Sequence, residues 1–124
     1  MALQSNYASI QPYVTRDGSE IRELMHPEVH GNHAQSLAEA TVAPGGVTLL
    51  HRHPRTEEIY HFTRGRGVMT LGQERLTVQA GDTVCIPPGT AHCVENTDTE
   101  PLVLLCACSP AYSHADTELL PNLD

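Results

Sequence analysis

The chain has 124 residues and a formal net charge of −8, with only seven Lys and Arg residues in total. A chain of this length fits one domain, and it can bury about two-thirds of its unfolded surface without a disulfide or structural metal to hold it together. The acidic balance argues against nucleic acid and anionic membrane surfaces as partners, because both are bound by clustered cations.

The N-terminal part, residues 1–35, is expected to form an arm and edge strands. Its first residues lack the basic start and apolar run of a signal peptide, and no apolar stretch is long enough to span a bilayer, so we expect a cytoplasmic protein. Residues 16–19 indicate a turn. Residues 20–26 fit either a short strand or a helix limited to two turns by Pro27, and we favour the strand.

From residue 36 onward, Gly- and Pro-containing turns separate short segments of strand length. The predicted strands are residues 36–43, 47–53, 58–64, 67–71, 75–79, 83–87, 91–96 and 102–108. Many short strands joined by tight turns favour an all-β barrel or jelly roll over a helical or α/β fold. We therefore predict a single all-β domain with its barrel core at residues 36–108 and a C-terminal tail, residues 109–124, packed on the barrel.

The four cysteines form no Cys-x-x-Cys pair, so neither a zinc knuckle nor a thioredoxin-like motif is indicated. Cys106 and Cys108 share one face of the last predicted strand. We expect both to be buried, reduced thiols, which behave as small hydrophobic residues. The alternative is that they approach a metal from the barrel interior, or pair with each other by straining the strand.

Four side chains predict a metal site. His51 and His53 are two apart in a predicted strand, so both imidazoles face the same side. A lone His-x-His is weak evidence, because two packed or solvated histidines look the same in a sequence. Here Glu58 opens the next strand facing the pair, and the turn at residues 87–89 leads to His92. Three imidazoles and one carboxylate suit Mn, Fe, Co, Ni, Cu or Zn better than Mg or Ca.

These residues carry a resemblance to a known family, the cupin superfamily. Its first motif, G(X)5HXH(X)4E(X)6G, is matched by Gly45, His51, His53, Glu58 and Gly65, and its second, G(X)5PXG(X)2H(X)3N, by Gly81, Pro87, Gly89, His92 and Asn96. Fifteen residues separate the motifs, as in small single-domain bacterial cupins. The resemblance implies a conical β-barrel, or double-stranded β-helix, holding one divalent transition metal on His51, His53, Glu58 and His92. It also implies coordination positions left open for a ligand, and a homodimer.

Other side chains have weaker claims to a role. Tyr60 shares the face of Glu58 and could contact a substrate, hold the carboxylate or simply fill the core. Met69 is a candidate pocket residue for which barrel core is the simpler interpretation. His26, His30 and His33 could close over the pocket and act as acid or base, although a solvated loop is the simpler interpretation.

The resemblance leaves the reaction open, because similar barrels serve many functions. Our first hypothesis is a metal-dependent enzyme, of dioxygenase, isomerase, lyase or cyclase type, that acts on a small oxygenated molecule, with Glu58 and Tyr60 as possible catalytic residues. The second is a non-catalytic barrel that binds or senses a small ligand and carries a structural metal. A storage or structural barrel is a third.

Overall fold

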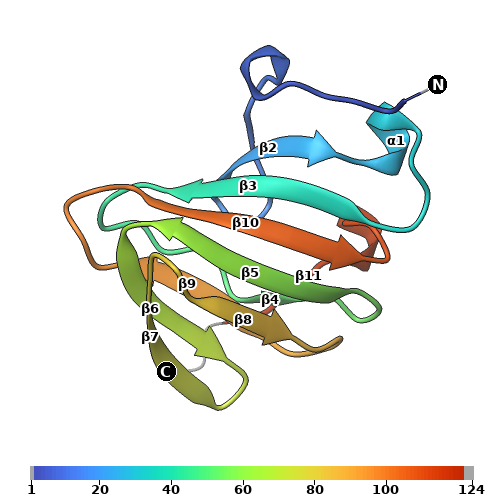
Figure 1. Ribbon diagram of the computed structural model, residues 1–124. Helices are drawn as coiled ribbons and strands as arrows, with labels where there is room; N and C mark the ends of the chain where they lie inside the picture. The colour runs from blue at the N-terminus through green and yellow to red at the C-terminus, as the bar shows by residue number, and fades with distance from the viewer. Residues whose placement is uncertain (1, 122–124) are drawn as a thin grey trace.

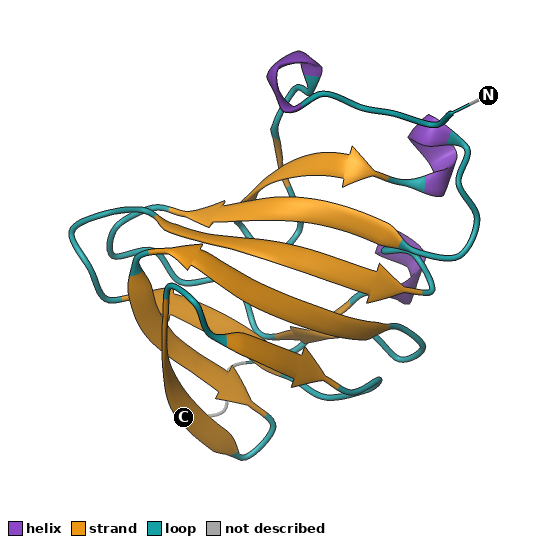
Figure 2. Ribbon diagram, viewed as in Figure 1, coloured by secondary structure: helices purple, strands orange, loops and turns teal. Residues whose placement is uncertain are grey.

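The computed structural model describes residues 2–121, so residue 1 of the predicted arm and residues 122–124 of the predicted tail lie outside the described residues. Strands dominate, as Figure 2 shows, and the short helices lie at the periphery. The helical elements are η1 (Tyr7–Ser9), α1 (Pro27–His30) and η2 (His114–Asp116). The strands are β1 (Tyr13–Val14), β2 (Glu20–Met25), β3 (Ser36–Val42), β4 (His51–Arg52), β5 (Glu57–Arg64), β6 (Arg66–Leu71), β7 (Glu74–Gln79), β8 (Thr83–Ile86), β9 (His92–Asn96), β10 (Leu102–Ser109) and β11 (Glu118–Leu119).

The strands form two sheets that face each other across one core (Figure 1). One sheet has the order β1-β2-β3-β10-β5-β8 and the other the order β11-β4-β9-β6-β7, and every pairing is antiparallel. This confirms the predicted all-β fold.

Alternation along each strand decides which side chains reach the core. In β5, Glu58, Tyr60 and Phe62 are buried, whereas the residues between them are exposed. Phe62, Met69, Ile86, Leu102 and Leu104 are the largest apolar side chains that are fully buried, and they come from both sheets. Burying a side chain of this size contributes about 1.5–3 kcal/mol, so this cluster is the main source of stability.

One glycine is required where the strands approach most closely. A Cβ atom on Gly67 of β6 would lie 2.2 Å from the carbonyl oxygen of Glu95 on β9. No larger residue fits there without moving the two strands apart, so glycine allows the sheet to close over the core.

The predicted strand at residues 47–53 is much shorter in the structure, because its first half makes irregular contacts instead of a continuous ladder. The backbone N–H of Leu49 donates to the carbonyl oxygen of Asp17, and the hydroxyl of Thr48 accepts from the backbone N–H of Val94. Only His51–Arg52 remain in a regular ladder as β4. The other predicted strands of the barrel core agree with β3 and β5 to β10 within two residues at each end.

The N-terminal segment extends the first sheet. Residues 20–25 form the favoured strand, β2, which pairs with β3 on one side and β1 on the other. Pro27 begins the helix α1, since the first helical turn tolerates a residue without an N–H. None of the helices within residues 2–121 has the length and hydropathy needed to cross a membrane.

Candidate metal centre

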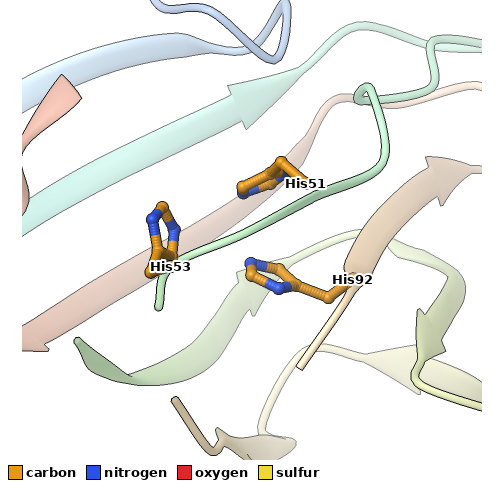
Figure 3. Close-up of side chains that lie close together, drawn as sticks. All are labelled: His51, His53 and His92. Atoms are coloured by element: carbon orange, nitrogen blue, oxygen red, sulfur yellow. The ribbon is translucent and has the colours of Figure 1, made fainter. Parts of the chain in front are cut away.

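Three imidazoles converge at one end of the barrel. His51 lies in β4, His53 directly follows it, and His92 begins β9, where it is the register partner of His51. One ring nitrogen of each lies within 4.8 Å of the others, and all three residues are buried. Figure 3 shows the rings gathered around a common space.

The Nδ1 atom of each histidine has a partner, which fixes the orientation of the ring. The Nδ1 of His51 lies 2.8 Å from the carbonyl oxygen of Leu49, and that of His92 lies 3.0 Å from the carbonyl oxygen of Thr90. The Nδ1 of His53 lies 3.1 Å from the hydroxyl oxygen of Thr117. Because a carbonyl can only accept, the rings of His51 and His92 carry their proton on Nδ1. Their Nε2 lone pairs are then available to a metal.

Glu58 places its carboxylate beside the histidines. Its Oε1 lies 3.3 Å from the Nε2 of His53 and 3.3 Å from the Nε2 of His92. Its Oε2 accepts a hydrogen bond of 3.3 Å from the Sγ of Cys108. The structure therefore brings together the four residues for which the sequence predicts a metal site.

Burial and neighbouring charges set the protonation of these groups. Burial lowers the pKa of His51 to about 4, and nearby His92 adds to this effect. Burial opposes ionisation of Glu58, but the neighbouring imidazoles of His53 and His92 outweigh it and hold the pKa of Glu58 at about 2. Burial also acts to lower the pKa of His53, yet the Glu58 carboxylate raises it overall. A neutral His51 and an ionised Glu58 are the forms that bind a metal.

Two buried atoms of this cluster lack a hydrogen-bond partner among the described residues, and they face each other. These are the Oε1 of Glu58 and the Nε2 of His92, which are close but not aligned for a hydrogen bond. An uncompensated buried polar atom is costly, and a bound cation would satisfy both. With the three-imidazole, one-carboxylate donor set, this makes the site fit a divalent transition metal.

A small cavity of about 40 Å³ lies beside these residues. One wall of the cavity is formed by two rungs of the first sheet, each a row of residues paired across neighbouring strands. In these rungs, small residues of β3 and β10 lie between larger ones. One rung is Glu23, Ala38, Cys106 and Tyr60, and the other is Ser36, Cys108 and Glu58. Small side chains at these positions leave the space that larger ones would fill.

The cavity is also lined by residues that the sequence did not single out for the site. Asp17, Glu23, Tyr13 and Tyr112 all line it. Asp17 belongs to the predicted turn at residues 16–19, and the Oδ2 of its carboxylate lies 3.8 Å from the Nε2 of His51. The alternation of Ile21 and Glu23 in a strand was the available signal for Glu23, but the sequence does not show which sheet that strand joins.

The secondary candidates separate into two groups. Tyr60 lines the cavity, whereas Met69 is completely buried in the hydrophobic core. Cys106 and Cys108 are free, buried thiols that line the cavity, and burial raises both pKa values, so the thiols stay protonated. Cys108 thus has a polar contact, with Glu58, beyond the packing role expected of it.

The histidines before the barrel do not line this cavity. His26 caps the N-terminus of α1, and its Nε2 lies 2.7 Å from the carbonyl oxygen of Tyr112. His30 accepts a hydrogen bond from the backbone N–H of His26, and His33 is exposed.

Comparison with known proteins gives consistent matches. A family profile described as the cupin domain matches residues 38–108. An uncharacterised protein of Methanocaldococcus jannaschii is 52% identical over 118 residues, which cover 95% of this chain and 94% of that protein. The tetracenomycin polyketide synthase protein TcmJ of Streptomyces glaucescens is 26% identical over 86% of this chain and 75% of its own length.

Among solved structures, the oxalate decarboxylase of Lactobacillus farciminis, in complex with formate, superposes with a TM-score of 0.79 at 26% identity. The match covers 91% of this chain and 34% of that chain, so this chain corresponds to about a third of the decarboxylase.

Proposed function

The chain belongs to the cupin family, and on that premise we propose that it is a metal-dependent enzyme acting on a small oxygen-bearing molecule. The observation that carries this proposal is the pair of buried, unpartnered atoms, Glu58 Oε1 and His92 Nε2, within a cluster of three histidines. A purely structural cluster would be expected to satisfy its own polar atoms.

We assign the metal ligands to His51, His53, Glu58 and His92. A bound divalent ion would supply Lewis-acid chemistry, by polarising an oxygen of the substrate. The protein's own contribution is to hold the ligand atoms in place. Leu49, Thr90 and Thr117 fix the rings through Nδ1, and Cys108 holds the carboxylate through its Oε2.

The named relatives support a small, oxygen-rich substrate. One is a protein of a polyketide synthase and another is an oxalate decarboxylase. Both names refer to compounds with several oxygen atoms that can approach a metal. The cavity here, of about 40 Å³, lies next to the histidines and is lined by hydroxyl and carboxylate groups, among them Tyr60 and Asp17.

Metal analysis tests the proposal first. Protein purified from its native source should carry close to one transition-metal ion per chain, and a His51→Ala, His53→Ala double variant should carry almost none. His61→Ala is the matched control, because His61 is exposed on β5 and contacts Thr83 away from the cavity. Native-source protein without metal would contradict the assignment.

Turnover assays test whether the protein is an enzyme. The metal-loaded wild-type protein should convert at least one compound from a panel of diketones, flavonols and polyketide-like substrates, and the double variant should convert none. Full activity in the double variant would reject a metal-dependent enzyme. Ligand binding without conversion would instead favour a non-catalytic binding barrel.

We also propose a homodimer formed through the N-terminal segment. Val14 of the edge strand β1 and Val29 of α1 are 72% and 71% exposed, which leaves apolar surface for a second copy to cover. Light scattering coupled to size-exclusion chromatography should give twice the chain mass, and a mass of one chain would contradict the dimer.

A further inference from the structure

We propose that Asp17 and Glu23 make this cavity select uncharged molecules that carry hydroxyl or amide donors and discriminate against free carboxylates. The inference rests on the proposed function, since it names the class of substrate that the same cavity takes. It also distinguishes between the two named relatives. Oxalate, named in the decarboxylase, carries two carboxylates and would be disfavoured by this cavity.

Asp17 places a carboxylate beside the Nε2 atom of His51, the nitrogen that we propose binds the metal. Its Oδ1 accepts hydrogen bonds from the backbone N–H of Ser19, at 2.9 Å, and from the Ser19 hydroxyl, at 2.7 Å. Its Oδ2 lies 3.8 Å from the Nε2 of His51, and the side chain is only 12% exposed. The turn therefore holds the carboxylate against the histidine cluster.

Glu23 brings a second carboxyl group to the cavity wall. It shares its face of β2 with Ile21, which also lines the cavity, and it pairs with Ala38 of β3. Its Oε2 accepts a hydrogen bond of 3.1 Å from the hydroxyl of Tyr13, whereas its Oε1 is buried and has no partner among the described residues. Burial raises the pKa of Glu23, and this effect outweighs the nearby His26 and the hydrogen bond from Tyr13, which act to lower it.

The cationic side chains closest in sequence are engaged elsewhere. The guanidinium of Arg16 donates to the carbonyl oxygens of His114 and Thr117, and that of Arg22 donates to Ile10 and lies over the ring of Tyr7. The chain contains no lysine. Within residues 2–121, no arginine lines the cavity.

The charge balance follows from these positions. A divalent ion held by Glu58 would have its charge offset by that carboxylate and by the nearby carboxylate of Asp17. An entering carboxylate would then meet Asp17 and Glu23 in a partly buried site where like charges repel strongly. A neutral hydroxyl or amide group, by contrast, can donate a hydrogen bond to the free Oε1 of Glu23.

The cavity beside the histidines is small, so compact probes suit the test. A volume of about 40 Å³ is room for roughly three water molecules, at about 10–15 Å³ each. Oxalate, oxamate and oxamide are therefore suitable probes, because they share one shape and carry two, one and no carboxylates.

The test measures the affinities of these three probes by titration calorimetry on the protein with its metal. In the Asp17→Asn, Glu23→Gln double variant, the affinity for oxalate relative to oxamide should rise at least tenfold, with oxamate between them. Both substitutions keep shape and remove charge, and the amide introduced by Asp17→Asn retains an oxygen for the contacts with Ser19. Glu20→Gln is the control, because Glu20 is exposed on the other face of β2 and does not line the cavity. It should leave the ratio unchanged.

A ratio in the double variant within twofold of the wild type would overturn the inference, and so would failure of all three probes to bind either protein. Metal content is measured on each preparation, so that failure of the proposed metal centre can be distinguished from failure of this inference. Protein that retains no metal contradicts the metal centre, whereas the ratio measured on that metal-free protein still decides whether the two carboxyl groups discriminate against anions.

Discussion

His51 and His92 are direct register partners across β4 and β9, and their ring centroids lie 4.2 Å apart. Two imidazoles at this separation cannot both be protonated cheaply in a buried site. Burial, together with the paired His92, thus keeps His51 in the neutral form that a metal requires, before any metal binds.

This arrangement predicts how the stability of the metal-free protein depends on pH. The pKa of His51 is about 4 in the folded chain, against about 6.5 for an unfolded histidine. Between these values the unfolded chain binds a proton that the folded chain does not, so the free energy of unfolding falls as the pH is lowered from 6.5 to 4. The contribution of His51 is about 3 kcal/mol. Urea unfolding at several pH values should show a smaller loss in His51→Gln than in the wild type.

Cys108 should influence the metal through Glu58. Removing the Sγ donor in Cys108→Ala frees the Oε2 of Glu58, and we expect metal affinity to fall by about 10-fold or more, as for other residues that support a ligand. Cys108→Ser, which keeps a donor, should retain most of the affinity. Competition with a chromogenic chelator measures both, with Cys85→Ser, on the exposed side of β8, as control. Equal affinities for Cys108→Ala and the wild type would show that the contact has no such role.

Asp116 should stabilise the turn that leads from His53 to Glu58. Its carboxylate accepts hydrogen bonds from the backbone N–H groups of Arg55, at 3.1 Å, and Thr56, at 3.0 Å. Asp116→Ala should lower the free energy of unfolding by about 2 kcal/mol, since hydrogen bonds to a charged group contribute about that much. Chemical denaturation checks this value. Asp82→Ala, which removes a similar turn contact to Gln79 far from the cavity, shows whether an accompanying loss of metal is specific to Asp116.

The core prediction concerns Phe62, which is completely buried between the two sheets. Phe62→Ala should cost about 3–5 kcal/mol in the free energy of unfolding, through lost burial and the cavity that remains. Ile59→Ala on the same strand is the control, because Ile59 is 40% exposed and should cost far less. Similar losses for the two variants would contradict the inward-facing register of β5.

The sequence was most informative where local spacing decides geometry. Two-residue alternation predicted that His51 and His53 share one face of their strand and that Glu58 and Tyr60 share one face of theirs, and the burial of all four agrees with this. The turn glycines and prolines likewise predicted the ends of most strands of the barrel core.

The sequence was least informative where a contact joins distant segments. Nothing in the sequence near Asp17 indicates that its carbonyl oxygen accepts a hydrogen bond from the backbone N–H of Leu49. In the folded chain the carboxylate of Asp17 also lies beside His51. The same holds for Thr117, whose partner His53 is 64 positions away. Such contacts depend on which strand becomes the neighbour, and alternation within one strand cannot determine that.

Different strands supply the proposed metal ligands and the residues that set the volume of the cavity. The four proposed ligands lie in or beside β4, β5 and β9, whereas the volume beside them is set by Ala38 on β3 and Cys106 on β10. A bulkier or smaller residue at either position would change the volume of the cavity without replacing any of the four proposed ligands. Single substitutions can therefore change which ligands fit the cavity. Ligand selectivity should then evolve more easily than the set of metal ligands.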